Sequence, residues 1–380
     1  MSSRDFKVSI PIIKWIAESQ GSSIEELANV IAPKKPEKFI EGVLNKTQAS
    51  ELVKLGKIPF GFLFLPNPPD IVKPTLPDFR NTTESIPLSD NFYDAFADVQ
   101  EKLDWYNEYL TRNNMRKKLP FVGKYHVSDS VQEIAIDITK SLKIDQMQLE
   151  KLKKEDYFKN IVCEVEFIGI LVFRNGIVKV NTRRSLDVDE FRGFAIADKY
   201  TPAIFINGND APSAQLFTLL HEIAHIWIGE GGVSNLAYPF ENRIESHCNK
   251  IAAEVLMPTR SFEELWDNEL TKDSNISSLS NFFKTSEISV VIKAHQLNLV
   301  SNEDVCKVRE DLEQHLRREK IAKKGKGGGN FYNTLPWRNS QFLTNTIVKD
   351  ALNQNTLLQE AGRLLHAKPN AIVNRLSERV

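Results

Sequence analysis

The strongest hydrophobic pattern of the chain lies between residues 217 and 228. Apolar side chains recur there at the spacings of a helix that is buried over most of its surface. They are Phe217, Leu219, Leu220, Ile223, Ala224, Ile226 and Trp227. Glycines follow at positions 229, 231 and 232, and glycine commonly ends a helix. We therefore predict a buried helix that Asp210 or Ser213 begins and that the glycines end.

A second helix is predicted from Arg243 to Met257, and Pro258 closes it because proline cannot continue a helix. Within this segment, four positions separated by four, three and four residues share one helical face. They are Glu245, Asn249, Ala252 and Leu256. A carboxylate with a polar group one turn later therefore faces the same side as a packed apolar surface.

Upstream of these helices the pattern favours strands. Residues 161–165 and 169–178 are rich in β-branched side chains, and Asn175-Gly176 is a typical hairpin turn. Residues 203–207 form a further apolar run of strand length. We expect this last strand to lie at the edge of a sheet beside the buried helix. Such an edge could hold an extended peptide by main-chain hydrogen bonds.

The rest of the chain indicates helices and linkers. Residues 1–66 contain two short helical patterns joined at Gly21, as in a helix-turn-helix. Ser22 or Ser23 could cap the second helix, with Glu25 or Glu26 completing a capping box. Residues 66–77 are rich in proline and read as a linker. The segments 90–160 and 260–320 are helical in spacing, and the aromatic stripe of Trp105, Tyr106 and Tyr109 is typical of a core.

Composition indicates an ordinary globular protein. A chain of 380 residues with 41% hydrophobic and 26% charged residues can form two or three domains. The net charge of −1 excludes a general polyelectrolyte character. Three cysteines give no paired framework and suit the reducing cytosol, and neither a signal peptide nor an apolar stretch of membrane-spanning length is found. We expect a cytoplasmic protein.

The chemistry of the chain is concentrated in the buried helix, which carries His221-Glu222-Ile223-Ala224-His225, an H-E-x-x-H sequence. Two histidines four residues apart lie on one helical face, so both rings can bind one zinc ion. Glu222 lies beside the open position of that ion and is the predicted catalytic base. The alternative is a core helix with two histidines that bind no metal.

The third ligand is expected from the second helix, and Glu245 is the candidate. Glu241 and Glu254 are weaker rivals for this position. His247 points away from Glu245 on a helix, and Cys248 is more typical of a packed apolar group, because a thiolate would close the fourth position. The group that would stabilise the oxyanion stays open among Tyr200, Tyr238, His247 and Arg192.

With these residues the chain resembles the ImmA/IrrE family of zinc metallo-endopeptidases. The similarity includes residues 169–173, 190–194 and 202–207, the run FTLLHEIAHIWIG, and the run E-x-x-C-N-x-x-A-A-E-V-L-M-P that starts at Glu245. In that family two histidines and a glutamate bind zinc and another glutamate acts as base. The matching positions are His221, His225 and Glu245 for Zn²⁺ and Glu222 for the base.

The two ends of the chain also resemble longer members of this family. Residues 1–66 are similar to a repressor-type helix-turn-helix, except that Pro33 and Pro36 lie in the expected recognition stretch and suit a helix poorly. The module either reads DNA or has become a packing domain. The segment from Leu316 to Val380 contains twelve Lys and Arg residues but only four Asp and Glu residues. This excess could touch nucleic acid or an acidic partner, although a solvated helical cap with a basic linker explains it equally.

These observations predict an α+β fold: a mainly helical, multidomain chain with a zincin-like metallopeptidase domain that carries a small β-sheet. We expect five regions. They are a helix-turn-helix-like domain (1–66), a linker and helical region (67–160), the metallopeptidase domain (161–270), a helical region (271–320), and a basic linker with a C-terminal helical extension (321–380).

The expected function is zinc-dependent hydrolysis of peptide bonds. The family resemblance implies limited cleavage of a helix-turn-helix repressor, relieving repression in a stress response or in a mobile element. The alternative is a DNA-binding regulator or toxin-antitoxin component whose zinc site is vestigial or structural. The partners would accordingly be a protein substrate and, through the terminal modules, DNA.

Overall fold

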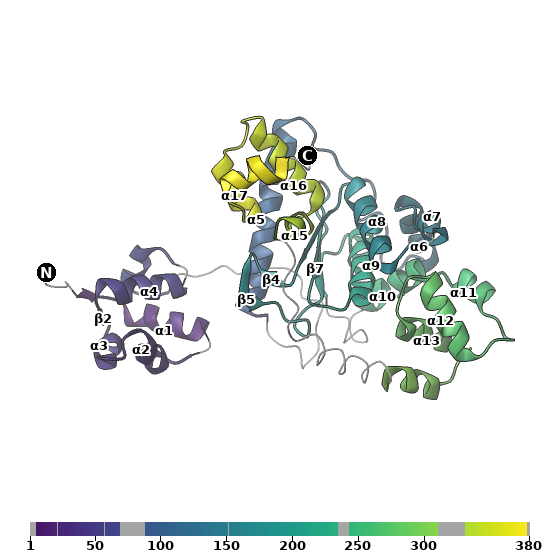
Figure 1. Ribbon diagram of the computed structural model, residues 1–380, viewed down its shortest axis with the longest axis horizontal. Helices are drawn as coiled ribbons and strands as arrows, with labels where there is room; N and C mark the ends of the chain where they lie inside the picture. Colours follow the sequence, from purple (N-terminus) through teal and green to yellow (C-terminus); the bar gives the residue numbers. More distant parts are fainter. Residues whose placement is uncertain are drawn as a thin grey trace. The chain divides into compact units, whose positions relative to one another are not determined.

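The structure is a computed structural model of the chain that describes two compact units, Met1–Pro74 and Thr75–Val380 (Figure 1). Its described residues are 5–20, 22–56, 58–68, 88–150, 152–234, 243–310 and 331–377. Both units are mainly helical with short sheets, which confirms the predicted α+β class. Within the described residues, no helix combines the length and the apolar character needed to cross a bilayer.

The N-terminal unit packs short helices around a core of its own. Its elements are β1 (Phe6–Lys7), α1 (Ile10–Ser19), α2 (Ile24–Ile31), α3 (Pro36–Ile40), β2 (Val43–Leu44), α4 (Lys46–Gly56) and the 3-10 turn η1 (Phe60–Phe64). The strands β1 and β2 pair antiparallel. At the start of α2 the Ser23 hydroxyl accepts from the Glu26 N–H, and the Glu26 carboxylate accepts from the Ser23 N–H. The predicted capping box is therefore confirmed.

The stretch expected to read DNA is not a continuous helix. The helix α2 stops at Ile31, and Pro36 occupies the first position of α3, where a proline loses no hydrogen bond. The two prolines thus break the chain into separate helices, as their chemistry predicted. DNA binding by this unit stays a prediction.

A four-stranded sheet forms the centre of the larger unit. Its strands, in spatial order, are β3 (Leu171–Asn175), β7 (Ala203–Asn207), β6 (Gly193–Ile196) and β8 (Gly232–Ser234). The pair β3–β7 is parallel, whereas β6 pairs antiparallel with both β7 and β8. Beside it, β4 (Ile177–Val178) and β5 (Asn181–Ser185) form a separate antiparallel ribbon.

Three expectations about strands are wrong. Residues 161–165 belong to the helix α8 (Lys154–Phe167), where Ile161, Val162 and Val165 share the buried face of a helix. Asn175-Gly176 does not join a hairpin, because β3 pairs with β7 and β4 pairs with β5. Finally, β7 lies between β3 and β6 rather than at an edge. Partner choice between strands depends on long-range packing that the local pattern does not contain.

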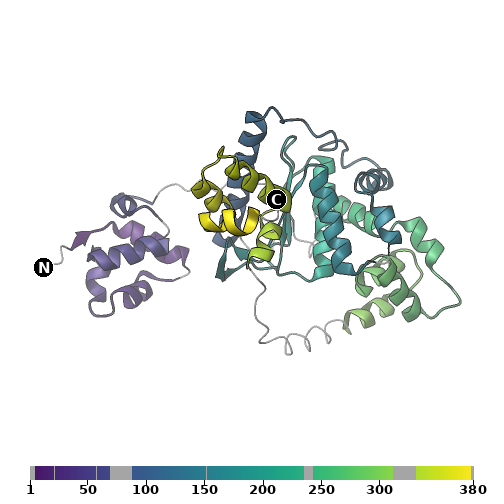
Figure 2. The same ribbon diagram turned by 45° about the horizontal axis from the view of Figure 1, so that its top comes forward.

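The sheet lies between two helical layers (Figure 1 and Figure 2). On β7, Ile204 and Ile206 face a core shared with α8, α9 (Pro212–Ile228) and α10 (Arg243–Leu256). The alternate residue Phe205 faces a second core, which it shares with α5 (Asp90–Arg112) and α16 (Gln341–Leu352). The strict alternation follows from the two-residue period of a strand, and it places α9 flat against β6 and β7.

The remaining helices surround these layers. They are α6 (Val131–Ser141), α7 (Ile144–Leu149), α11 (Thr259–Leu265), α12 (Lys272–Phe282), α13 (Glu287–Gln296), α15 (Phe331–Arg338), α17 (Leu358–Leu365), α18 (Pro369–Ala371) and the turn η2 (Ile372–Leu376). Residues 302–310 are also helical. The aromatic stripe of α5 packs in the second core, as predicted, since Trp105 and Tyr106 are buried. The proposed basic linker at 323–329 and most of the proline-rich linker lie outside the described residues.

Candidate metal centre

The helix α9 is held in the middle of its unit. Pro212 occupies its first turn, and Ala211, rather than Asp210 or Ser213, is its N-cap residue, so the predicted side-chain cap is wrong. Asp210 instead accepts the Ala211 N–H and pairs with Arg192. At the other end Gly229 adopts a φ of +82° and donates to the carbonyls of His225 and Ile226. This left-handed conformation favours glycine and ends the helix as predicted.

The structure brings His221, His225 and Glu245 together. The Nε2 atoms of the two histidines are 3.0 Å apart. Glu245, from α10, places its Oε2 at 3.1 Å from His221 Nε2 and its Oε1 at 3.1 Å from His225 Nε2. All three side chains are buried, and their donor atoms lie within 4.8 Å of one another. This group could hold a metal ion.

A hydrogen bond orients the His225 ring. His225 Nδ1 lies 2.9 Å from the carbonyl oxygen of Glu230, just past the end of α9. A carbonyl only accepts, so Nδ1 carries a proton, and Nε2 is the ring atom that lies beside Glu245 and is left to a metal. Asn249, one turn after Glu245, acts on the other ring, since it is among the groups that raise the pKa of His221. The expected polar support within α10 therefore reaches a histidine.

The three side chains shift one another's pKa values. Burial alone would raise the pKa of Glu245, but the two histidines outweigh it and hold that pKa at about 2. Burial lowers the pKa of His221 below its ordinary value, although Glu245 acts in the opposite direction. Glu245 is thus an anion and His221 a neutral base at neutral pH, as metal ligands are. Burial would lower the pKa of His225, but Cys248 and Glu245 outweigh it and raise that pKa well above its ordinary value, so a metal would displace a proton from this ring.

Glu222 lies on α9 next to His221 and is fully buried. It faces the strand β6 at Gly193, where an added Cβ would come within 2.8 Å of Glu222 Oε1 and 2.7 Å of Thr218. Only glycine leaves room there for the carboxylate. A glycine inside a strand often marks a close approach of another group, but no strand was predicted here from the sequence, so this contact was missed.

The other acidic and sulfur candidates do not join the group. Glu254 accepts from Lys293 Nζ at 2.8 Å and from Thr259 Oγ1, which ties α10 to α13 and α11. Cys248 is fully buried, as expected, and it interacts with His225, but it is not among the residues whose donor atoms cluster. Glu241 lies outside the described residues.

The four candidates for oxyanion stabilisation have different surroundings. Arg192 is engaged with Asp210 at 3.1 Å, and Tyr200 lies under the guanidinium of Arg116, at 3.6 Å from the ring centroid. His247 is half-buried on α10, and burial lowers the pKa of its ring. Tyr238 falls outside the described residues. No single donor is selected by these contacts.

Residues 166–295 match the model of the IrrE N-terminal-like domain, Peptidase_M78. The matched segment contains the sheet, α9, α10 and the complete His-His-Glu group. The match supports a metallopeptidase domain of the ImmA/IrrE type, and the buried group that could hold a metal fits such a domain. The N-terminal unit and the C-terminal helices lie outside the matched segment. No curated protein matches the chain.

Proposed function

We propose that this protein is a zinc-dependent endopeptidase. The observation that carries the proposal is the convergence of His221, His225 and Glu245, with N···N and N···O separations of 3.0 and 3.1 Å, directly beside Glu222. Two histidines and a carboxylate are a ligand set that catalytic zinc sites use. Three protein ligands leave one position of a tetrahedral ion for water or substrate.

The donor geometry fits zinc. Ligands at about 2.0–2.1 Å from a tetrahedral ion lie roughly 3.3 Å from one another. The observed separations are shorter by only about 0.2–0.3 Å, so binding requires a small outward movement of side chains. Zinc held there would lower the pKa of a bound water to about 7.

Glu222 performs the proton transfers in this proposal. Its carboxylate follows His221 directly and lies against Gly193, where it can accept a proton from the attacking water. The same carboxyl group then donates that proton to the amine that leaves. Burial of the side chain restricts its motion and keeps bulk water from competing for the proton.

The substrate would bind as an extended strand. Because β7 is interior, this role passes to β8, which ends the described sheet on the side of β6. Its residue Ser234 pairs with Gly193, the glycine that contacts Glu222. A peptide that added to β8 would therefore lie close to the base and the metal ligands.

The family resemblance suggests a helix-turn-helix repressor as the substrate. The test incubates the full chain and zinc with a purified helix-turn-helix repressor as candidate substrate and measures cleavage by mass spectrometry. Glu222→Gln should lower the rate by about 10²–10⁴-fold and leave the zinc content unchanged, because it removes only the proton acceptor.

The matched control is Glu230→Gln, which makes the same change at an exposed side chain whose backbone carbonyl alone contacts His225. It should cleave at the wild-type rate. If Glu222→Gln cleaves as fast as this control, the protein is not a peptidase of this mechanism. DNA binding that persists in Glu222→Gln, together with an absence of cleavage by the wild type, would favour the regulator instead.

A further inference from the structure

A second concave site lies at the opposite end of α9 from the histidines. A pocket of about 350 Å³ opens there between α8, β3, α9, the turn after α12, and α15. This volume is within the usual range for small-molecule sites. Ser213 lines it and precedes His221 by eight residues, or about 12 Å along a helix. The pocket is therefore separate from the metal group.

The pocket wall carries a surplus of positive charge. Its basic residues are Lys154, Lys159, Arg174 and Lys284, and its one acidic residue is Glu155. Among the described residues, only Lys159 of these four has a carboxylate within ion-pair distance, the exposed Asp156 at 3.3 Å. Lys284 donates to the carbonyl of Asn281 instead. Cations gathered around a cavity without matching acids disfavour each other unless an anion enters.

Arg174 is fixed in place by a neutral partner, with Glu155 as the acid that attracts it. Its Nε donates to Gln215 Oε1, and Gln215 is itself buried and donates to the carbonyls of Gly208 and Asp210. The guanidinium carbon lies 5.5 Å from the centroid of the Phe158 ring. Burial lowers the pKa of Arg174, which reflects the cost of holding this cation away from water. Its terminal nitrogens remain available to an oxyanion, with which guanidinium forms paired hydrogen bonds.

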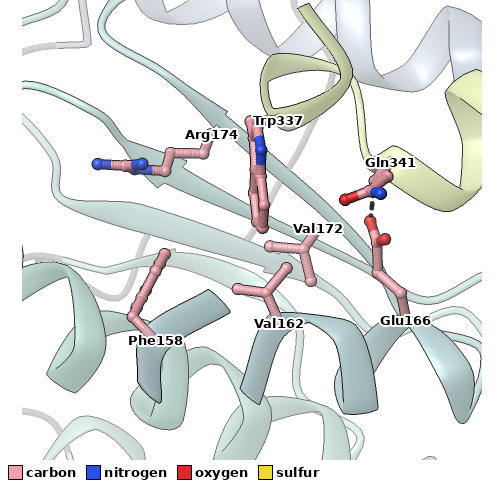
Figure 3. A pocket seen from close by; sticks show the side chains of 7 residues that line it. All are labelled: Phe158, Val162, Glu166, Val172, Arg174, Trp337 and Gln341. Carbon is pink, nitrogen blue, oxygen red and sulfur yellow. Dashed lines mark hydrogen bonds between the residues drawn. The ribbon is translucent and has the colours of Figure 1, made fainter. Parts of the chain in front are cut away.

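Two further features suit a phosphate with a ring attached. Figure 3 shows the Trp337 indole between Arg174 and Gln341, with Phe158 below Arg174, so aromatic surfaces border the cationic groups. The start of α9 has no side-chain cap, and the first N–H bonded within the helix is that of Gln215. The N–H groups of Ser213 and Ala214 are thus left to other acceptors, at the positive end of the helix dipole.

We propose that this pocket binds a small organic phosphate that carries a planar ring, of the nucleotide class. The phosphate contacts Arg174, Lys284 and the start of α9, and the ring packs against Trp337 and Phe158. This site is independent of peptide hydrolysis, and it gives a metabolite direct contact with the helix that carries the metal ligands.

The test is calorimetric titration of the full chain with ADP, without added divalent cation, with inorganic phosphate and adenosine as separate arms. ADP should bind saturably and change the fluorescence of Trp337, an effect that Trp337→Phe removes. Phosphate and adenosine should each bind at least about tenfold more weakly, since each supplies only half of the contacts.

Variants separate this site from general attraction between charges. Lys159→Gln with Lys284→Gln should weaken ADP binding by about tenfold for each lost charge, and Arg174→Gln by at least as much. The matched control, Lys117→Gln with Lys118→Gln, removes two exposed charges away from the pocket and should bind as the wild type does.

Two results would overturn the proposal. One is the absence of saturable ADP binding below the millimolar range, or equal binding by the pocket and control variants. The other is loss of binding after chelation of the metal, which would place the phosphate at the histidines. Binding that survives chelation supports the pocket even if Glu222→Gln shows that the protein is not a peptidase.

Discussion

The two ends of α9 offer opposite chemical environments. At the C-terminal end, two imidazole rings and the Glu245 carboxylate converge on a point that a cation would fill. At the N-terminal end, cations and free N–H groups surround a cavity that an anion would fill. The helix dipole favours both, because its negative end lies near His225 and its positive end near Ser213. One buried helix can therefore hold a metal and an anion without either charge opposing the fold.

The largest effect should follow from removing a ligand at the metal end. Zinc binding at structural sites has a free energy of roughly −12 kcal/mol, which divides into about 4 kcal/mol for each of three ligands. Glu245→Ala removes one ligand and should weaken zinc binding about a thousandfold. Zinc content after dialysis, measured by atomic emission, checks this. Glu254→Gln is the control on the same helix, and it should keep its zinc because that carboxylate pairs with Lys293. Equal zinc loss in both variants would contradict the assignment of ligands.

A smaller effect is expected at the contact between the sheet and the base. Gly193→Ala places a Cβ 2.8 Å from Glu222 Oε1, closer than such atoms pack, and should displace the carboxylate by a few tenths of an ångström or more. Misplacement of this size should lower kcat by about 10–100-fold with zinc content unchanged. Gly61→Ala is the control, since no atom lies within 4 Å of its added Cβ. Wild-type kcat in Gly193→Ala would show that Glu222 does not depend on this glycine.

The smallest effect concerns the other end of the helix. Ser213→Asp adds a negative charge to the first turn of α9, near Arg174 and the lysines, and should stabilise the fold by about 0.3–1 kcal/mol. It should also compete with the phosphate and weaken ADP binding. Ser213→Asn, of similar size without charge, is the comparison for both thermal unfolding and titration. Stronger ADP binding by Ser213→Asp would mean that the pocket does not receive an anion at this helix end.

The metal end could be predicted because its residues follow local rules. His221 and His225 need only the pitch of one helix, and Glu245 was found from its position on the apolar face of the next. Gly193 was not assigned a role, and no strand was predicted around it. Its contact with Glu222 depends on how β6 packs against α9, which no local spacing contains.

Elsewhere the same local rules failed for identifiable reasons. Residues 161–165 are β-branched but lie in α8, because Tyr157, Phe158 and Ile161 continue a helical stripe that the core buries. β7 lies inside the sheet because β3 and β6 pair with it on either side. Such pairing joins strands that are distant in the sequence, so the local pattern could not predict it. The pocket at Arg174 joins residues 154 to 337 and could not be inferred from any single segment.

The most direct test of the account is zinc-edge X-ray absorption spectroscopy of the full chain loaded with one equivalent of zinc, compared with His221→Ala. We predict two nitrogen and one or two oxygen neighbours at about 2.0–2.1 Å in the wild type, with one imidazole fewer in the variant. A spectrum that the substitution leaves unchanged would show that zinc binds elsewhere and that His221, His225 and Glu245 are not its ligands.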